Sequence, residues 1–177
     1  MIRELIHDPG ATRDSSPDAT KKSRQDSVTP YFTRFGSDPN YGMYVMRPLD
    51  YSCYAGSSVF VSTPSDLVRF GMAMNSGKLL KPATVELLQT PQVLPSGEDT
   101  DYGLGWYLKT AMLAGKPTRV TGHDGDSMSG MVASLMTFPQ YGIVVAVTSN
   151  ISHADTFAVG MKIAEAFLGQ GRSPASK

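Results

Sequence analysis

The sequence has little cysteine, no net charge and no long apolar run. Its single cysteine, Cys53, excludes an internal disulfide and a thiolate metal cage, and its tyrosine neighbours favour a small buried filler. Lys plus Arg and Asp plus Glu both number 16, so no net field would attract nucleic acid or an anionic membrane. The apolar run around 143–147 is far too short to span a bilayer. Residues 1–7 contain no apolar signal region of the usual length, so the compartment is unknown.

The remaining composition is that of a globular protein. Hydrophobic residues make up 41% and charged residues 18% of the 177 residues, which is enough for one domain with a sizeable core. Residues 1–54 are predicted to be a loop-rich segment because polar residues dominate it; isolated aromatic residues between 31 and 45 are expected to form short strands. Residues 55–169 are predicted to form the regular part, and residues 170–177 a flexible tail.

Helix signals begin shortly after residue 60. Thr63 can cap a helix, Pro64 suits its first position, and Asp66 favours the positive end of the helix dipole. Apolar residues at three- and four-residue spacing continue this helix to Gly77. Similar patterns predict two further helices, at about 82–89 and 157–169.

Strand signals occupy the region between the second and third helices. Predicted strands cover residues 102–108, 119–123, 131–138 and 141–148, and the last two form a hairpin. Helices, then an antiparallel meander, then a covering helix predict an α+β fold, with an antiparallel sheet of about three strands packed by helices.

One short motif, Gly122-His123-Asp124-Gly125, predicts a histidine at the start of a strand. Such a histidine is more often structural than catalytic, so the residues alone leave both interpretations open. The carboxylates of Asp124 and Asp126 lie nearby in sequence, but they lack the further oxygen ligands of a calcium loop, and no second histidine stands at helical spacing. Neither a metal site nor a cofactor is predicted.

Several motifs follow one another in a fixed order, at 55–67, 77–80, 102–106, 122–125 and 147–150. Their order and spacing resemble those of the serine β-lactamase-like proteins. This family includes class C β-lactamases, D-alanyl-D-alanine peptidases, related esterases and LACTB-type proteases. More loosely, Met1–Asp18 resembles the helix and Asp-Pro segment that follows the Tyr-x-Asn motif of the family.

The resemblance implies a mechanism. In the family, a helix-borne serine attacks an acyl carbon and is activated by a lysine one turn later and a tyrosine or similar group across the cleft. His123-Asp124-Gly125 matches the third motif, His-x-Gly, in which Gly125 lets the substrate approach the backbone. The backbone N–H of Asp126 is then expected to face the developing oxyanion. Further expected substrate contacts are Asp124, Ser127 and Trp106, although a tryptophan in a glycine-flanked strand is as often a core anchor.

The sequence departs from the family pattern at two positions near this motif. Asp126 stands where the family usually has a small residue, and a carboxylate near an oxyanion would be unfavourable unless its side chain faces away. Gly130 comes about one residue late, which predicts a bulge.

The first two family motifs are absent. The chain contains no Ser-x-x-Lys and no Tyr-x-Asn or Ser-x-Asn triplet, so the resemblance implies the C-terminal part of a β-lactamase/transpeptidase-like fold. Three hypotheses follow: an enzyme part that lacks its nucleophile, a non-catalytic remnant that binds a ligand along the same strand, and a structural or assembly module. The expected partners are a small-molecule or peptide acyl substrate and either a homo-oligomer or a complementing N-terminal segment. A sheet without its N-terminal strands would leave an open edge and uncovered apolar surface.

Overall fold

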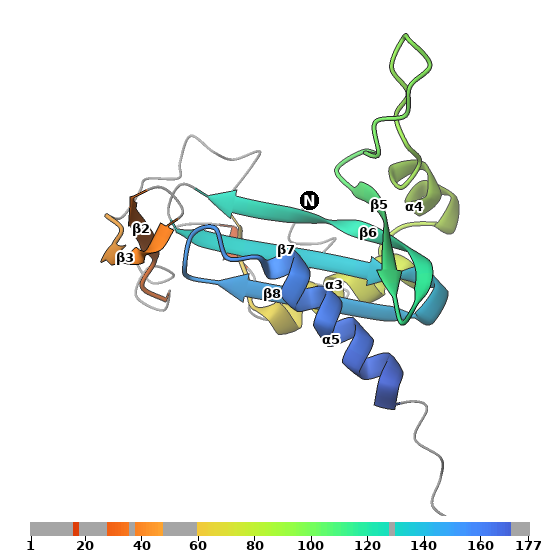
Figure 1. The fold of residues 1–177 in the computed structure, drawn as a ribbon. Helices are drawn as coiled ribbons and strands as arrows, with labels where there is room; N and C mark the ends of the chain where they lie inside the picture. The colour runs from red at the N-terminus through yellow and green to blue at the C-terminus, as the bar shows by residue number, and fades with distance from the viewer. Residues whose placement is uncertain (1–15, 18–27, 36–37, 48–59, 128–129, 171–177) are drawn as a thin grey trace, which may run out of the picture.

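A four-stranded antiparallel sheet with the order β5-β6-β7-β8 organises the chain (Figure 1). The computed structural model describes residues 16–17, 28–35, 38–47, 60–127 and 130–170. The strands of the sheet are β5 (Tyr107–Leu113), β6 (Lys116–Ser127), β7 (Met131–Phe138) and β8 (Ile143–Ser149). The helices are α3 (Pro64–Asn75), α4 (Pro82–Leu88) and α5 (Thr156–Gln170), and a 3₁₀ turn spans Pro139–Tyr141. The fold is α+β, as the sequence predicts.

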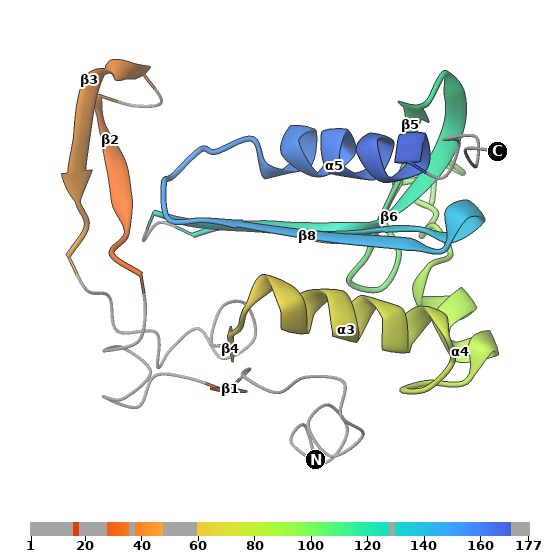
Figure 2. The ribbon, with the colours of Figure 1, turned by 90° about the horizontal axis from the view of Figure 1, so that it is seen from below.

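Helices cover both faces of this sheet, with α5 on one face and α3 on the other (Figure 2). Strand alternation places Met136 and Phe138 of β7 in the core under α5, with Val145 and Ala164. Leu135 of β7 packs in a second cluster, together with residues of α3. We call these two sides of the sheet the α5 face and the α3 face.

The predicted start of α3 is confirmed in detail. The side chain of Thr63 caps the helix, and its hydroxyl accepts a hydrogen bond of 3.2 Å from the backbone N–H of Asp66. Pro64 opens the first turn, where a missing N–H costs nothing. Asp66 is fully buried, and its carboxylate is stabilised by Arg69 at 2.6 Å. Helix α3 can pack close to the sheet because Gly71 has no side chain; an added Cβ would come within 2.7 Å of Val144.

The sheet has four strands instead of about three, and its first strand begins later than predicted. Residues 102–106 form a turn, because the backbone N–H of Leu104 bonds to the carbonyl of Leu88 at 2.9 Å and Gly105 has a positive φ of 79°. The strand therefore starts at Tyr107 and continues to Leu113. Ala114 and Gly115 then connect it to β6; both have positive φ, as a two-residue hairpin turn requires.

The N-terminal residues that the structure describes form small sheets beside the main one. Strands β2 (Tyr31–Phe35) and β3 (Asp38–Val45) pair antiparallel, which confirms the predicted short strands. This hairpin lies at one end of the main sheet (Figure 2), where the backbone of Tyr31 bonds to Asn150 and Ser152. A second pair joins β1 (Ser16–Pro17) and β4 (Phe60–Val61).

Several predictions lie outside the described residues: the helix that the resemblance implies at the start of the chain, the environment of Cys53 and the tail beyond residue 170. Among the helices that the structure does describe, none is long and apolar enough to cross a membrane.

Candidate functional site

Strand β6 is paired differently along its two halves. Residues Lys116–Gly122 pair with β5 on one side, and Thr121–Ser127 pair with β7 on the other. Because β5 begins at Tyr107, opposite Gly122, the stretch from His123 to Ser127 has no strand on its outer side among the described residues. We call this stretch the open edge of β6.

The His-Asp-Gly motif lies within this open edge. The sequence predicted a strand at 119–123 with the histidine near its boundary, whereas β6 continues through the motif to Ser127. Pairing with β7 explains the difference, since the register runs from Thr121 opposite Thr137 to Ser127 opposite Met131. This continuous register shows no bulge. The late glycine, Gly130, is instead in the turn that follows, with a φ of +79°.

Strand alternation separates the motif into two sets. His123 lies opposite Leu135, which belongs to the cluster on the α3 face, and Gly125 shares that face. Asp124 and Asp126 lie on the α5 face. Residues adjacent in sequence therefore face opposite layers of the molecule.

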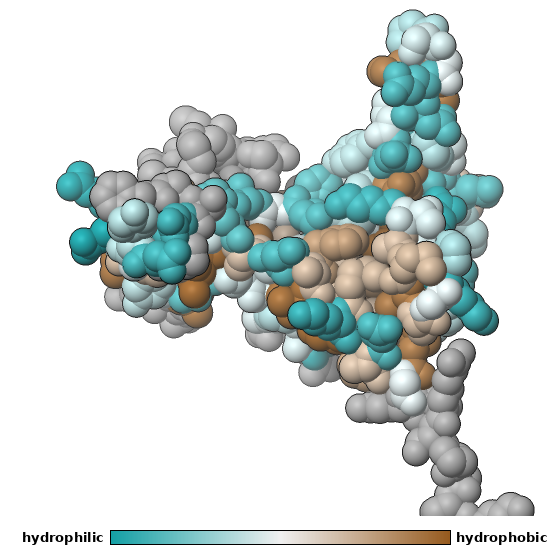
Figure 3. Space-filling view, in the orientation of Figure 1, coloured by the Kyte–Doolittle hydropathy of each residue, from teal (hydrophilic) through white to brown (hydrophobic). Residues whose placement is uncertain are grey.

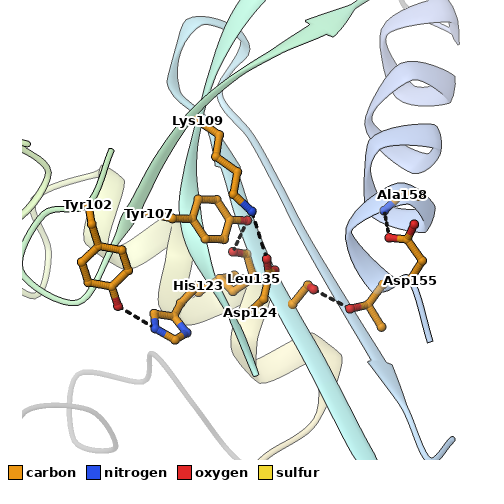
Figure 4. Close-up of polar contacts among 10 residues, drawn as sticks. Tyr102, Tyr107, Lys109, His123, Asp124, Leu135, Asp155 and Ala158 are labelled. Carbon is orange, nitrogen blue, oxygen red and sulfur yellow. Dashed lines mark hydrogen bonds and ion pairs between the residues drawn. The ribbon is translucent and has the colours of Figure 1, made fainter. Parts of the chain in front are cut away.

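His123 is exposed and makes one side-chain hydrogen bond among the described residues. Its Nε2 lies 2.7 Å from the hydroxyl of Tyr102, and the two rings meet edge to face with centroids 6.0 Å apart (Figure 4). Sequence reasoning missed this partner. The Tyr102–Trp106 motif was recognised, but neither periodicity nor spacing indicates that its tyrosine turns towards β6.

The two glycines of the motif have opposite surroundings. A Cβ added to Gly122 would overlap the backbone carbonyl of Leu135 and lie 2.8 Å from the hydroxyl of Tyr107. A Cβ added to Gly125 would meet no atom within 4 Å. Gly122 is thus required by packing within the chain, whereas the space beside Gly125 is open.

Asp124 joins a charged and aromatic group on the α5 face. Its Oδ2 lies 3.4 Å from Nζ of Lys109, and this ammonium lies 4.2 Å from the ring centroid of Tyr107 and 4.6 Å from that of Phe157 (Figure 4). Burial, with a smaller contribution from the Asp124 charge, raises the pKa of Tyr107 above its usual value of 10.0. The phenol of Tyr107 therefore stays neutral at ordinary pH. It donates a 3.4 Å hydrogen bond to the carbonyl of Leu135.

The side chain of Asp126 points towards His153, with 3.2 Å between Oδ2 and Nδ1. His153 has a positive φ of 60° and stacks its ring edge to face with Phe32 at 5.3 Å.

The two remaining predicted substrate contacts, Ser127 and Trp106, lie in different parts of the fold. Ser127 is the last residue of β6, and its side chain lies outside the described part of the structure. Trp106 is in the core: it is only 7% exposed and packs with Met74 and Leu108 on the α3 face. Its aromatic surface is used to support the sheet. Within the described residues, no three His, Cys, Asp or Glu side chains gather closely enough to hold a metal ion.

Comparison with solved structures identifies the fold. The chain is similar to an octameric penicillin-binding protein homologue from Pyrococcus abyssi, with a TM-score of 0.68, 19% identity, and coverage of 95% of this chain and 37% of that one. A D-stereospecific amidohydrolase from Streptomyces sp. gives a TM-score of 0.67 at 21% identity, covering 93% and 46%. A D-amino acid amidase from Ochrobactrum anthropi SV3 gives 0.66 at 17%, covering 97% and 51%.

These coverages mean that the chain spans about half, or less, of the length of the structures that it resembles. The comparison with curated proteins found no significant match. A model of the Beta-lactamase family matches residues 1–170, almost the entire chain. The chain therefore belongs to the serine β-lactamase-like family.

Proposed function

We propose that this chain forms one wall of the catalytic cleft of a β-lactamase-like serine hydrolase, which acts on the acyl group of a lactam, ester or peptide. His123 and Gly125 line this wall. The serine nucleophile and its lysine come from an upstream segment or from a separate chain. The observation that carries the proposal is the open edge of β6, on which His123 and Gly125 share one face.

An extended substrate fits this edge through the backbone. The N–H and C=O groups that point outward between His123 and Ser127 have no strand partner among the described residues, so a substrate can pair with them as an added strand. The free space beside Gly125 lets the substrate lie close to the strand. Asp124 and Ser127 are expected to contribute substrate contacts at the same edge; Trp106 is left out because it is buried.

The role of Asp126 is to supply its backbone N–H to the oxyanion that develops on the acyl group. Its carboxylate lies near His153 on the α5 face, so the negative charge is kept on the other side of the strand from His123. Losing one such donor typically lowers the rate by about a hundredfold to a thousandfold.

Uncovered apolar surface supports a complementing segment or a second copy. Val159 and Phe167 of α5 are 48% and 63% exposed. Figure 3 shows brown surface over this helix, interrupted by a few hydrophilic residues. On the sheet, no described strand pairs with the outer side of β8. A further layer over α5 and a strand beside β8 would remove both features.

Active-site labelling tests the proposal. A fluorophosphonate or a penicillin, read by mass spectrometry, is expected to leave this chain alone unlabelled, since no serine here has a lysine three residues later. When an upstream segment carrying Ser-x-x-Lys is supplied, the label is expected on that serine. Labelling of this chain alone would contradict the assignment of the nucleophile.

Two glycine variants test the wall itself. Gly125→Ala adds a methyl group where the chain has free space, and Gly169→Ala near the end of α5 does the same far from β6. We expect Gly125→Ala to slow labelling of the completed protein by roughly ten- to a hundredfold, because the substrate is displaced from the strand. Gly169→Ala should label at the original rate. Equal rates for both variants would place the substrate elsewhere.

A non-catalytic binding remnant is the second candidate, and the same open edge favours it. The binding remnant predicts no labelling even with the upstream segment, together with peptide binding that Gly125→Ala abolishes.

A purely structural module is the third candidate. The structural module predicts neither labelling nor binding, but only an assembly that sedimentation detects. A monodisperse monomer that shows no apolar surface by dye binding would contradict the expected self-association or complementation.

A further inference from the structure

The segment between α4 and β5, residues 89–106, reaches the candidate site through one side chain. It extends away from the body of the molecule and returns to the sheet at Tyr102 (Figure 1). There the phenol of Tyr102 and the imidazole of His123 point towards each other (Figure 4).

The backbone holds Tyr102 firmly in this place. Its carbonyl accepts hydrogen bonds from the backbone N–H of Gln92 at 2.8 Å and from the hydroxyl of Thr100 at 3.0 Å. The next residue, Gly103, donates to the carbonyl of Trp106 at 2.7 Å, and an added Cβ would overlap the carbonyl of Leu88. The segment is therefore fixed both before and after Tyr102, which orients the phenol before any ligand arrives.

The chemistry of the contact selects one proton arrangement. A phenol is a better donor than acceptor, and the unprotonated nitrogen of a neutral imidazole is the stronger acceptor of the two groups. The favoured bond therefore runs from the Tyr102 hydroxyl to Nε2 of His123 at 2.7 Å. A neutral imidazole that accepts at Nε2 carries its proton on Nδ1, because the hydrogen bond at one ring nitrogen sets the state of the other.

We propose that Tyr102 is a positioning residue that holds neutral His123 as the Nδ1–H tautomer. Nδ1 lies on the side of the ring away from Tyr102 and makes no hydrogen bond with the described residues (Figure 4). His123 then presents a donor, which can hold a carbonyl or carboxylate oxygen of the substrate but cannot accept its proton. The tautomer follows from the geometry; its use as a substrate donor rests on the proposed function.

The test reads the tautomer directly by ¹⁵N NMR of the His123 ring in the full chain, at a pH where the ring is neutral. In the original sequence, Nε2 is expected to resonate as an unprotonated acceptor and Nδ1 as a protonated nitrogen. In Tyr102→Phe, loss of one net hydrogen bond of about 1 kcal/mol should lower the ratio of Nδ1–H to Nε2–H about fivefold.

Tyr141→Phe is the matched control, because Tyr141 has similar exposure and no described contact with His123. It should leave the tautomer ratio unchanged. A ring already protonated on Nε2 in the original chain, or an unchanged ratio in Tyr102→Phe, would overturn the proposal. The measurement needs no turnover, so it can succeed even if labelling shows that the completed protein is no hydrolase.

Discussion

The two halves of β6 differ in what constrains them. In the half from Lys116 to Gly122, β5 pairs with every residue and β7 joins at Thr121 and Gly122, and Val120 and Thr121 are completely buried. In the half from His123 to Ser127, only β7 is paired, and His123 and Gly125 are exposed. The first half is determined by packing, whereas the outer side of the second half has no strand partner among the described residues. The change occurs at a single residue, Gly122, where β5 begins.

The largest expected effect distinguishes the two glycines. Gly122→Ala places a methyl group against the backbone carbonyl of Leu135, which cannot move without separating β6 from β7. We expect a loss of about 3 kcal/mol in the free energy of unfolding, measured by urea denaturation. Gly125→Ala should change it by less than about 0.5 kcal/mol. Similar losses for both variants would show that the open half is also constrained by packing.

A smaller effect is expected from a buried hydroxyl pair at the point where β6 and β7 begin to pair. Thr121 and Thr137 are both fully buried, with 2.7 Å between their hydroxyl oxygens. Thr121→Val leaves the Thr137 hydroxyl without this partner and should cost about 2 kcal/mol. Adding Thr137→Val should restore most of the stability, because both polar groups are then gone. A double-mutant cycle on the unfolding free energies checks this; simply additive losses would count against the pairing.

The smallest expected effect is a pH dependence at the boundary between the halves. Tyr107 lies opposite Gly122, and its raised pKa means that the folded state keeps the phenolic proton after the unfolded chain has lost it. Its contribution to stability is therefore complete below pH 10.0 and is lost as the pH rises above that value, by at most about 1.4 kcal/mol per pH unit.

Tyr107→Phe isolates this contribution, because other groups titrate alike in both proteins. Unfolding free energies measured between about pH 9 and 11.5 should fall more steeply for the original chain than for the variant. Parallel curves would mean that Tyr107 ionises as readily in the folded chain as in the unfolded one.

The sequence predicted the elements whose signals are local. The cap at Thr63, the α5 periodicity and the hairpin across Pro139 each depend on residues within one turn or one strand pair, and all three are confirmed. The start of β5 could not be predicted, since it depends on the distant carbonyl of Leu88 bonding to Leu104. Trp106 could not be assigned for a related reason: the aromatic pattern left a substrate contact and a core position both open, and its burial against Met74 and Leu108 depends on distant packing.

The candidate site shows the same division between features with local sequence signals and features that depend on distant contacts. The motif and its glycine could be recognised from the residues, but the open edge depends on where β5 starts. The contact between Tyr102 and His123 joins residues separated by 21 positions, and no periodicity indicates it. The orientation of Asp126 became clear only when the register of β6 against β7 was known.

The strand order β5-β6-β7-β8 also has a kinetic consequence. Every neighbour in this sheet is also the next strand in the chain, and Ala114 and Gly115 alone connect the first pair. Closing such short loops costs little chain entropy, so pairing can spread from one hairpin to the next without waiting for distant segments. The strand that carries His123 can therefore form early, before the N-terminal residues join the end of the sheet.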